Sequence, residues 1–270
     1  MKDDQKGQYF LTTHSPTVLR ELTVEHLHIV HRDADGVQVV HAAGDDLQGL
    51  NIQGHVRSSA EAFLSKKVII CEGQTEVGFM RGMDHLWSKP PQTKEPFSYM
   101  GIVLLNAGGA SKISGLATGF RRLHYDVIVL ADGDAQDQFS DQNAADLRKI
   151  GASVTMWANN LSIEQCAMSD LPWMQVQASL TLAAEREFPV VAQVASKLQQ
   201  ALPPDFSTWE DSPALRAAIG AAAKGCSWFK DITHGELWGE IVFSALAIPA
   251  FQKTDLATKL QQLRDWIDND

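Results

Sequence analysis

Basic residues and cysteines are both scarce in this sequence. Its 270 residues include 23 Lys and Arg against 33 Asp and Glu, which gives a formal net charge of −10 at pH 7. This balance excludes the globally basic surface typical of non-specific nucleic-acid binding, although a local groove or a metal ion can still hold phosphates. The three cysteines, Cys71, Cys166 and Cys226, are widely spaced and odd in number, which excludes a disulfide framework and a CxxC zinc site. We therefore expect a reducing, cytoplasmic setting.

Long apolar runs are missing as well. No run reaches the ~18–20 residues of a membrane span, and the first ten residues, MKDDQKGQYF, lack an apolar signal region. We therefore expect no membrane partner. The hydrophobic content of 44% is ordinary for a globular protein, and at ~150 residues per domain the length allows one large domain or two smaller ones.

The N-terminal part alternates short apolar runs with turns. Residues 8–13 (QYFLTT) predict a short buried strand, and TVLREL at 17–22 predicts a helix. Two β-rich runs flank a D-x-D-G turn within residues 26–42, which is typical of a β-hairpin. Residues 43–58 are polar and show no clear period, so they are expected to be a linker.

Strands and helices alternate from about residue 59. Apolar runs predict strands at 66–71, 101–107, 126–132 and 153–158. Helical segments are predicted between them at 72–87, 108–124 and 141–151. This alternation predicts βαβ units in a parallel sheet flanked by helices. Beyond residue 171 the chain is rich in Ala, Gln and Leu and amphipathic, so the fold class is α/β with an additional α-helical domain.

Acidic side chains gather where the predicted strands end. Glu72 directly follows VIIC, Asp132 and Asp134 follow VIVLA, and Glu164 follows the fourth strand after a short loop. Glu76 lies four residues past Glu72, about one helical turn away. Ligands of parallel sheets bind beyond these strand ends. Five carboxylates there would repel one another without a cation, and Mg²⁺ or Mn²⁺ relieves such repulsion. The pattern alone predicts an acidic metal site.

The acidic motifs also resemble a known family. EGQTE at 72–76 and DGD at 132–134, each after an apolar strand, resemble the TOPRIM domain shared by primases, topoisomerases and several nucleases. Upstream, QYFLTTHSPTVLREL resembles the last strand of an ABC-type ATPase, with its switch histidine at His14. An ATPase end followed directly by a TOPRIM domain resembles the OLD (overcoming lysogenization defect) family of ATP-dependent endonucleases. IEQCAMSDLPW at 163–173 and KGCSWFKDITHGELWGEIV at 224–242 resemble further segments of that family.

This resemblance implies a domain order and a reaction. Residues 1–58 would be an ATPase remnant and linker, 59–170 the TOPRIM catalytic domain, and 171–270 a helical domain. The implied activity is nicking or cleavage of DNA with two Mg²⁺ or Mn²⁺ ions, in defence against phage. The family resemblance also implies a homodimer.

The resemblance assigns a role to each candidate residue. Glu72 would ligate metal or act in acid–base chemistry, and Asp132 and Asp134 would ligate metal. Glu76 and Glu164 would bind a second metal, assisted by Ser162. Either Lys230 or Lys224 would stabilise charge on the phosphate, with Lys230 preferred because it lies in WFKDI.

One departure from the family limits this assignment. The chain has no Walker A motif, G-x-x-x-x-G-K-[ST]. We therefore expect the C-terminal part of a longer protein, in which ATP serves only the missing N-terminal ATPase domain and His14 is a remnant. Three alternatives stay open: another TOPRIM chemistry (topoisomerase or primase), a D-x-D phosphatase, and a non-enzymatic metal-binding dimerisation module.

Overall fold

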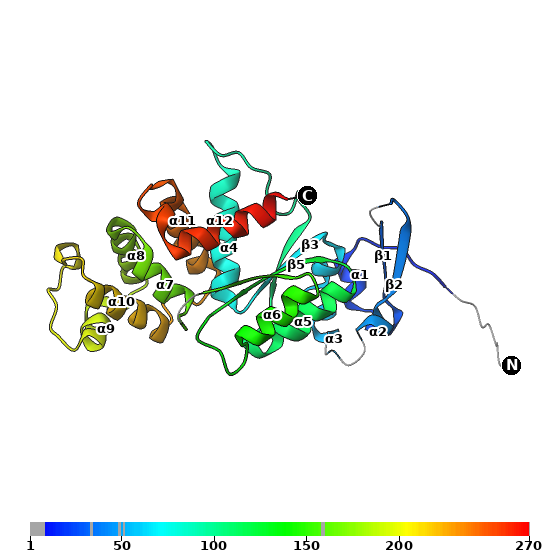
Figure 1. Ribbon diagram of the computed structural model, residues 1–270, viewed down its shortest axis with the longest axis horizontal. Coiled ribbons are helices and arrows are strands. Elements are labelled where there is room, and N and C mark those ends of the chain that lie inside the picture. Colours follow the sequence, from blue (N-terminus) through cyan, green and yellow to red (C-terminus); the bar gives the residue numbers. More distant parts are fainter. Residues whose placement is uncertain (1–8, 33–34, 48–49, 51, 158–159, 270) are drawn as a thin grey trace. The chain divides into compact units, whose positions relative to one another are not determined.

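The computed structural model divides into two compact units, residues 1–65 and 66–270. It describes residues 9–32, 35–47, 50, 52–157 and 160–269 (Figure 1). The parallel sheet and the candidate carboxylates all belong to the second unit. The predicted boundaries at residues 58 and 170 stay predictions.

The first unit is built from short helices and one hairpin. Its helices are α1 (Pro16–Arg20), α2 (Ala43–Asp46) and α3 (Gln53–Ser58), with 3₁₀ turns at Val24–His26 and Ala60–Leu64. Strands β1 (His28–Arg32) and β2 (Gln38–Ala42) pair antiparallel, with Val30 opposite Val40. The predicted hairpin is confirmed, and residues 33–34 of its turn lie outside the described residues.

Two predictions for this unit were wrong. No regular strand forms over the described residues 9–13, and Tyr9, Phe10 and Leu11 are exposed rather than buried. A strand needs a neighbouring strand for its backbone hydrogen bonds, and none of the described strands pairs with this segment. The expected linker at 43–58 instead contains α2 and α3, because its sparse apolar residues, such as Ile52 and Val56, are buried.

The second unit contains the predicted parallel sheet. Its strands are β3 (Lys67–Cys71), β4 (Ile102–Asn106), β5 (Asp126–Ala131) and β6 (Ser153–Met156). They lie in the order β4-β3-β5-β6, with every pair parallel. Central strand β3 is buried because it is apolar on both faces, as expected when helices cover both sides of a sheet. The α/β fold class is confirmed.

Helices cover both faces of this sheet. The intervening helices are α4 (Gln74–Ser88), α5 (Ala110–Arg122) and α6 (Asp141–Lys149), and α5 and α6 lie side by side opposite α4 (Figure 1). The C-terminal helices are α7 (Ile163–Asp170), α8 (Trp173–Glu185), α9 (Val190–Leu198), α10 (Pro213–Gly225), α11 (Ile232–Ser244) and α12 (Asp255–Asp268). Short 3₁₀ turns occupy Phe206–Thr208, Ala245–Ala247 and Phe251–Lys253. None of the described helices is long and apolar enough to cross a membrane.

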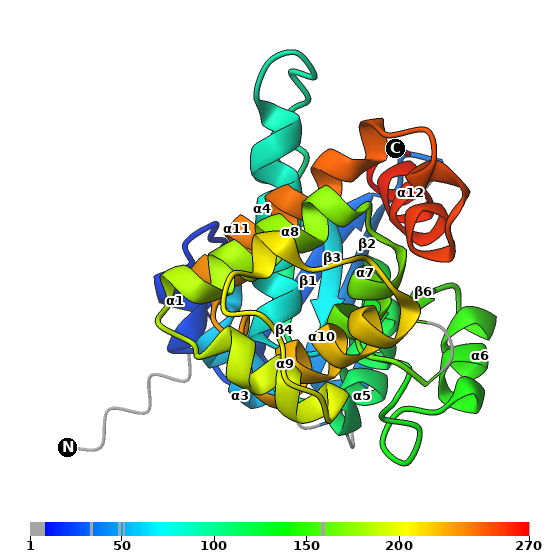
Figure 2. The same ribbon diagram turned by 90° about the vertical axis from the view of Figure 1, so that its left-hand side faces the viewer.

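Glycines bring α4 and α11 into backbone contact. A Cβ on Gly78 would lie 2.4 Å from the carbonyl oxygen of Ile232, and a Cβ on Gly239 would lie 2.4 Å from that of Phe79. Only glycine fits at such a distance, because a real Cβ would overlap the facing backbone. The two helices pack along each other in both views (Figures 1 and 2). The start of α11 is thereby held against the first turns of α4.

Candidate functional site

Glu72 and Asp132 are linked across the ends of β3 and β5. The backbone amide of Glu72 donates to the carbonyl oxygen of Leu130 at 3.2 Å, which extends the pairing of the two strands by one residue. In return, the backbone amide of Asp132 donates to Oε2 of Glu72 at 3.1 Å. Oδ1 of Asp132 accepts a hydrogen bond from the backbone amide of Ile163, the first residue of α7, at 2.9 Å. These hydrogen bonds connect the C-terminal ends of β3 and β5 with the first residue of α7.

Glu76 and Glu164 are the buried members of the group. Glu76 lies in the first turn of α4, where its Oε2 accepts a hydrogen bond from the backbone amide of Gly73 at 2.8 Å. Glu164 lies in the first turn of α7, and the exposed fractions of the two residues are 5% and 4%. Negative side chains are favourable in the first turn of a helix, which accounts for the local positions of both.

Burial and mutual repulsion act on the carboxylates at this edge of the sheet. Burial raises the pKa of Glu76 to about 7, and repulsion from Glu164 and then Glu72 adds to this. Burial also raises the pKa of Asp132 to about 9, with Glu76, Glu164 and Glu72 contributing in turn. The pKa of Glu72 is raised by burial too, against the hydrogen bond from Asp132 and the charges of Lys224 and Lys230. The structure therefore places Glu72, Glu76, Asp132 and Glu164 within electrostatic reach of one another.

Asp134 has a different partner from the other acids. It forms an ion pair with Lys224 in the last turn of α10, and 40% of the lysine side chain is exposed. Lys230 is exposed and lies two residues before α11. Because both lysines lower the pKa of Glu72, both lie within electrostatic reach of the carboxylates. The structure thus leaves both lysines as candidates for the cation.

The two remaining candidate residues, Ser162 and His14, lie in different environments. Ser162 is fully buried at the N-cap of α7, where its hydroxyl oxygen accepts a hydrogen bond from the backbone amide of Gln165 at 3.5 Å. This bond caps the helix that carries Glu164. His14 is exposed in the first unit, between Thr13 and the start of α1.

Sequence reasoning overlooked the importance of Gly133. A Cβ at this position would lie 2.1 Å from the carbonyl oxygen of Trp157, and the Gly133 amide donates to the carbonyl oxygen of Leu161 at 3.0 Å. The glycine therefore lets the chain between β6 and α7 approach the end of β5, which carries Asp132. A glycine between two acids was the available signal, although its partner is distant in sequence.

The donor set of the carboxylate group fits a hard divalent cation. It offers carboxylate oxygens only, which are the ligands that Mg²⁺ and Mn²⁺ prefer. A cation would also relieve the mutual repulsion that raises the pKa values of Glu76 and Asp132. Glu72, Glu76, Asp132 and Glu164 could hold it, with Asp134 available once it separates from Lys224.

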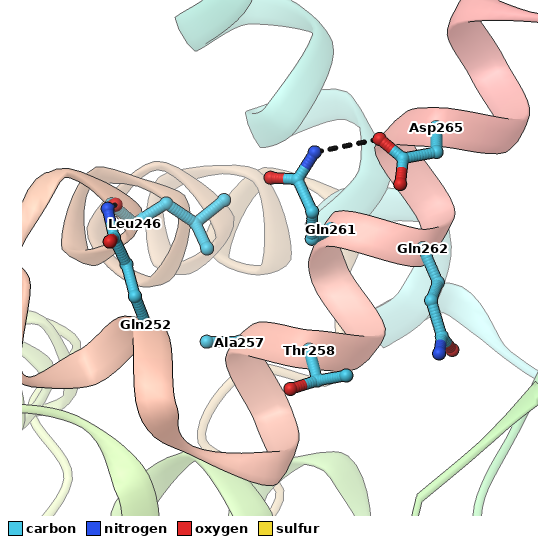
Figure 3. A pocket seen from close by; sticks show the side chains of 7 residues that line it. All are labelled: Leu246, Gln252, Ala257, Thr258, Gln261, Gln262 and Asp265. Carbon is cyan, nitrogen blue, oxygen red and sulfur yellow. Dashed lines mark hydrogen bonds between the residues drawn. The ribbon is translucent and has the colours of Figure 1, made fainter.

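A pocket elsewhere in the second unit lacks these features. It has a volume of about 500 Å³ and lies along α12 (Figure 3). Its lining consists of Leu246, Gln252, Ala257, Thr258, Gln261, Gln262 and Asp265. A hydrogen bond of 2.8 Å from Gln261 to Asp265 already pairs its one carboxylate. The candidate site is therefore the acidic sheet edge and not this pocket.

Comparison with known proteins identifies the segment that carries most of the acids. The family model of the overcoming lysogenization defect protein-like TOPRIM domain matches residues 63–134, which include Glu72, Glu76, Asp132 and Asp134. The C-terminal region of the Xanthomonas campestris pv. campestris OLD protein has a similar solved structure, with a TM-score of 0.41 and 17% sequence identity. That match covers 77% of this chain and 96% of the other. No curated protein matches the chain. Residues 63–134 of this chain thus match the model of an OLD-like TOPRIM domain.

Proposed function

We propose that this chain is the nuclease part of an OLD-family protein and hydrolyses phosphodiester bonds in DNA as a metal-dependent endonuclease. The observation that carries the proposal is the convergence of Glu72, Glu76, Asp132 and Glu164 within electrostatic reach of two lysines. TOPRIM domains generally bind divalent metals such as Mg²⁺, and an OLD-like TOPRIM domain supports a nuclease-type phosphoryl-transfer role. The proposed catalytic domain spans 59–170, beside a helical domain at 171–270.

Each carboxylate has a task in this proposal. Two bound Mg²⁺ or Mn²⁺ ions would polarise the scissile phosphate and make an attacking water more acidic. Glu72, Glu76, Asp132, Asp134 and Glu164 would supply the ligands. Asp132 is held through Oδ1 by the Ile163 amide, so Oδ2 can face a cation. Glu72 is held through Oε2 by the Asp132 amide, so Oε1 can accept a proton from the attacking water as the new P–O bond forms. The P–O bond to the leaving sugar oxygen would break in the same step, and that oxygen would take a proton from solvent water.

A lysine would stabilise the negative charge that builds on the phosphate. Lys230 is the better candidate because it is exposed, whereas Lys224 is paired with Asp134. We propose further that ATP serves only an N-terminal ATPase domain of the full-length protein. Homodimer formation, action against phage and the remnant role of His14 belong to the same proposal.

Incubation with supercoiled plasmid tests the nuclease directly. With Mg²⁺ or Mn²⁺ and without ATP, we expect open-circular and linear DNA, and with EDTA we expect none. Asp132→Ala should abolish cleavage, while Asp137→Ala, an exposed aspartate outside the carboxylate group, should retain it. Circular dichroism should show that both variants are folded. Full activity of Asp132→Ala, or cleavage in EDTA, would contradict the site.

A second assay separates the alternatives. Hydrolysis of a chromogenic phosphomonoester without plasmid cleavage would indicate a D-x-D phosphatase. Binding of Mn²⁺ by calorimetry without hydrolysis of either substrate would indicate a non-enzymatic metal-binding module.

A further inference from the structure

One guanidinium group spans the segment that carries Lys230. Arg186 is the C-cap residue of α8, and its Nη1 donates to the carbonyl oxygen of Trp228 at 3.2 Å. Its Nη2 pairs with Oδ2 of Asp231 at 2.7 Å. These two partners directly flank Phe229 and Lys230 in the sequence. Arg186 therefore ties together both ends of the short stretch that contains the lysine.

Both flanks of Lys230 are anchored to the rest of the second unit. Phe229 is fully buried and stacks on Trp238, with ring centroids 4.6 Å apart. Asp231 is the N-cap of α11, where it accepts a hydrogen bond from the backbone amide of His234 at 3.0 Å. Lys230 is the exposed residue between these two anchors, so their positions set the direction in which it leaves the backbone.

The anchored segment lies next to the carboxylates. The start of α11 packs against the start of α4, since a Cβ on Gly235 would lie 2.9 Å from the carbonyl oxygen of Thr75. Thr75 directly precedes Glu76. A shift of the segment would therefore move Lys230 relative to the acidic group.

The ion pair of Arg186 and Asp231 is partly exposed, and its contribution to folding is expected to be modest. The exposed fractions of the two side chains are 27% and 39%. Exposed pairs are screened by water and contribute weakly to stability. Removal of Arg186 should thus leave the protein folded.

We propose that Arg186 is a positioning residue that holds Lys230 toward the carboxylates through Trp228 and Asp231. This inference rests on the proposed function for its catalytic consequence, since Lys230 is there the group that stabilises charge on the phosphate. Lysine cannot replace the arginine, because one ammonium group does not offer the planar fork that reaches both partners. The proposal therefore concerns the geometry of the guanidinium and not merely its charge.

Kinetics of DNA cleavage test the catalytic part. Arg186→Ala should lower kcat on the order of tenfold to a hundredfold, with KM nearly unchanged, because misplacement of a catalytic group costs that much. Arg186→Lys should recover only a small part of the loss. In an Arg186→Ala/Lys230→Ala double variant the two losses should not multiply. Arg148→Ala is the matched control, because this exposed arginine also donates to a backbone carbonyl, that of Val154, but lies in α6.

Limited proteolysis tests the positioning without any nuclease activity. A lysine-specific protease should cut after Lys230 at least several-fold faster in Arg186→Ala than in the wild type, with cleavage after Lys197 unchanged. An unchanged rate at Lys230, or losses in kcat that multiply in the double variant, would overturn the proposal. If the wild type cleaves no DNA while proteolysis at Lys230 still accelerates, the proposed function fails and the positioning role stands.

Discussion

Asp132→Asn replaces an ionisable carboxyl of the carboxylate group with a neutral amide at nearly constant side-chain volume. The pKa of Asp132 is about 9 in the folded protein and 3.8 without the fold, because burial and then Glu76, Glu164 and Glu72 disfavour its charged form. Between these values the folded state binds the proton more tightly, so stability falls as pH rises from about 4 to about 9. Asparagine does not ionise in this range, and its Oδ1 can still accept the hydrogen bond from the backbone amide of Ile163. The variant should therefore be more stable than the wild type when metal is absent.

The size of this gain follows from the two pKa values. pH 7 lies about 3 units above 3.8, the pKa of Asp132 in the unfolded chain. At 1.36 kcal/mol per unit, burial of this carboxyl therefore costs the folded state about 4 kcal/mol at pH 7. Glu76, with a pKa of about 7, can take up a proton in place of Asp132 and so share the relief. We therefore expect Asp132→Asn to raise the free energy of unfolding by on the order of 2 kcal/mol at pH 7. The gain should be larger at pH 8.

Denaturation by urea in EDTA at pH 6, 7 and 8 measures this gain. Asp137→Asn is the control, because that aspartate is exposed and outside the carboxylate group. Added Mg²⁺ or Mn²⁺ should stabilise the wild type more at pH 8 than at pH 6, and should stabilise Asp132→Asn less. If Asp132→Asn matched the wild type in stability and in pH dependence, the repulsion argument would be refuted.

Three further predictions concern the ion pair of Asp134, the contact between α4 and α11, and the cysteines. Lys224→Met should tighten Mn²⁺ binding about fivefold in calorimetry. The substitution removes the lysine ammonium group that competes with the metal for Asp134, in an ion pair worth ~1 kcal/mol. Gly239→Ala should lower the free energy of unfolding by about 1–3 kcal/mol in urea, since α4 and α11 must separate; Gly54→Ala, whose Cβ meets nothing within 4 Å, should not lower it. A thiol reagent should modify Cys226 first, because the other two cysteines are buried with raised pKa values; equal rates for all three would contradict their burial.

The sequence by itself determined the features that depend on near neighbours. Apolar runs that alternate with amphipathic segments predicted the parallel sheet, because strand and helix formation depends on periodicity over a few residues. The acids at 72 and 132 follow those runs directly and Glu164 follows after a short loop, so the rule that ligands bind at strand ends predicted that these acids gather. Two predictions were wrong, a strand at 8–13 and a linker at 43–58. The secondary structure of both segments depends on which other segments pack against them, and local sequence does not show this.

Only the tertiary structure decided the interactions between distant segments. Glu72 and the Asp132 amide are 60 positions apart, and nothing local in the sequence shows that they share a hydrogen bond. The pairing of Lys224 with Asp134 and the bonds of Arg186 to the segment around Lys230 depend in the same way on how α8, α10 and α11 pack. The contact of α11 with α4 depends on glycines in both helices, whose partners lie more than a hundred residues away. Residue types and local order thus identify the acids, while helix packing decides which cation faces them.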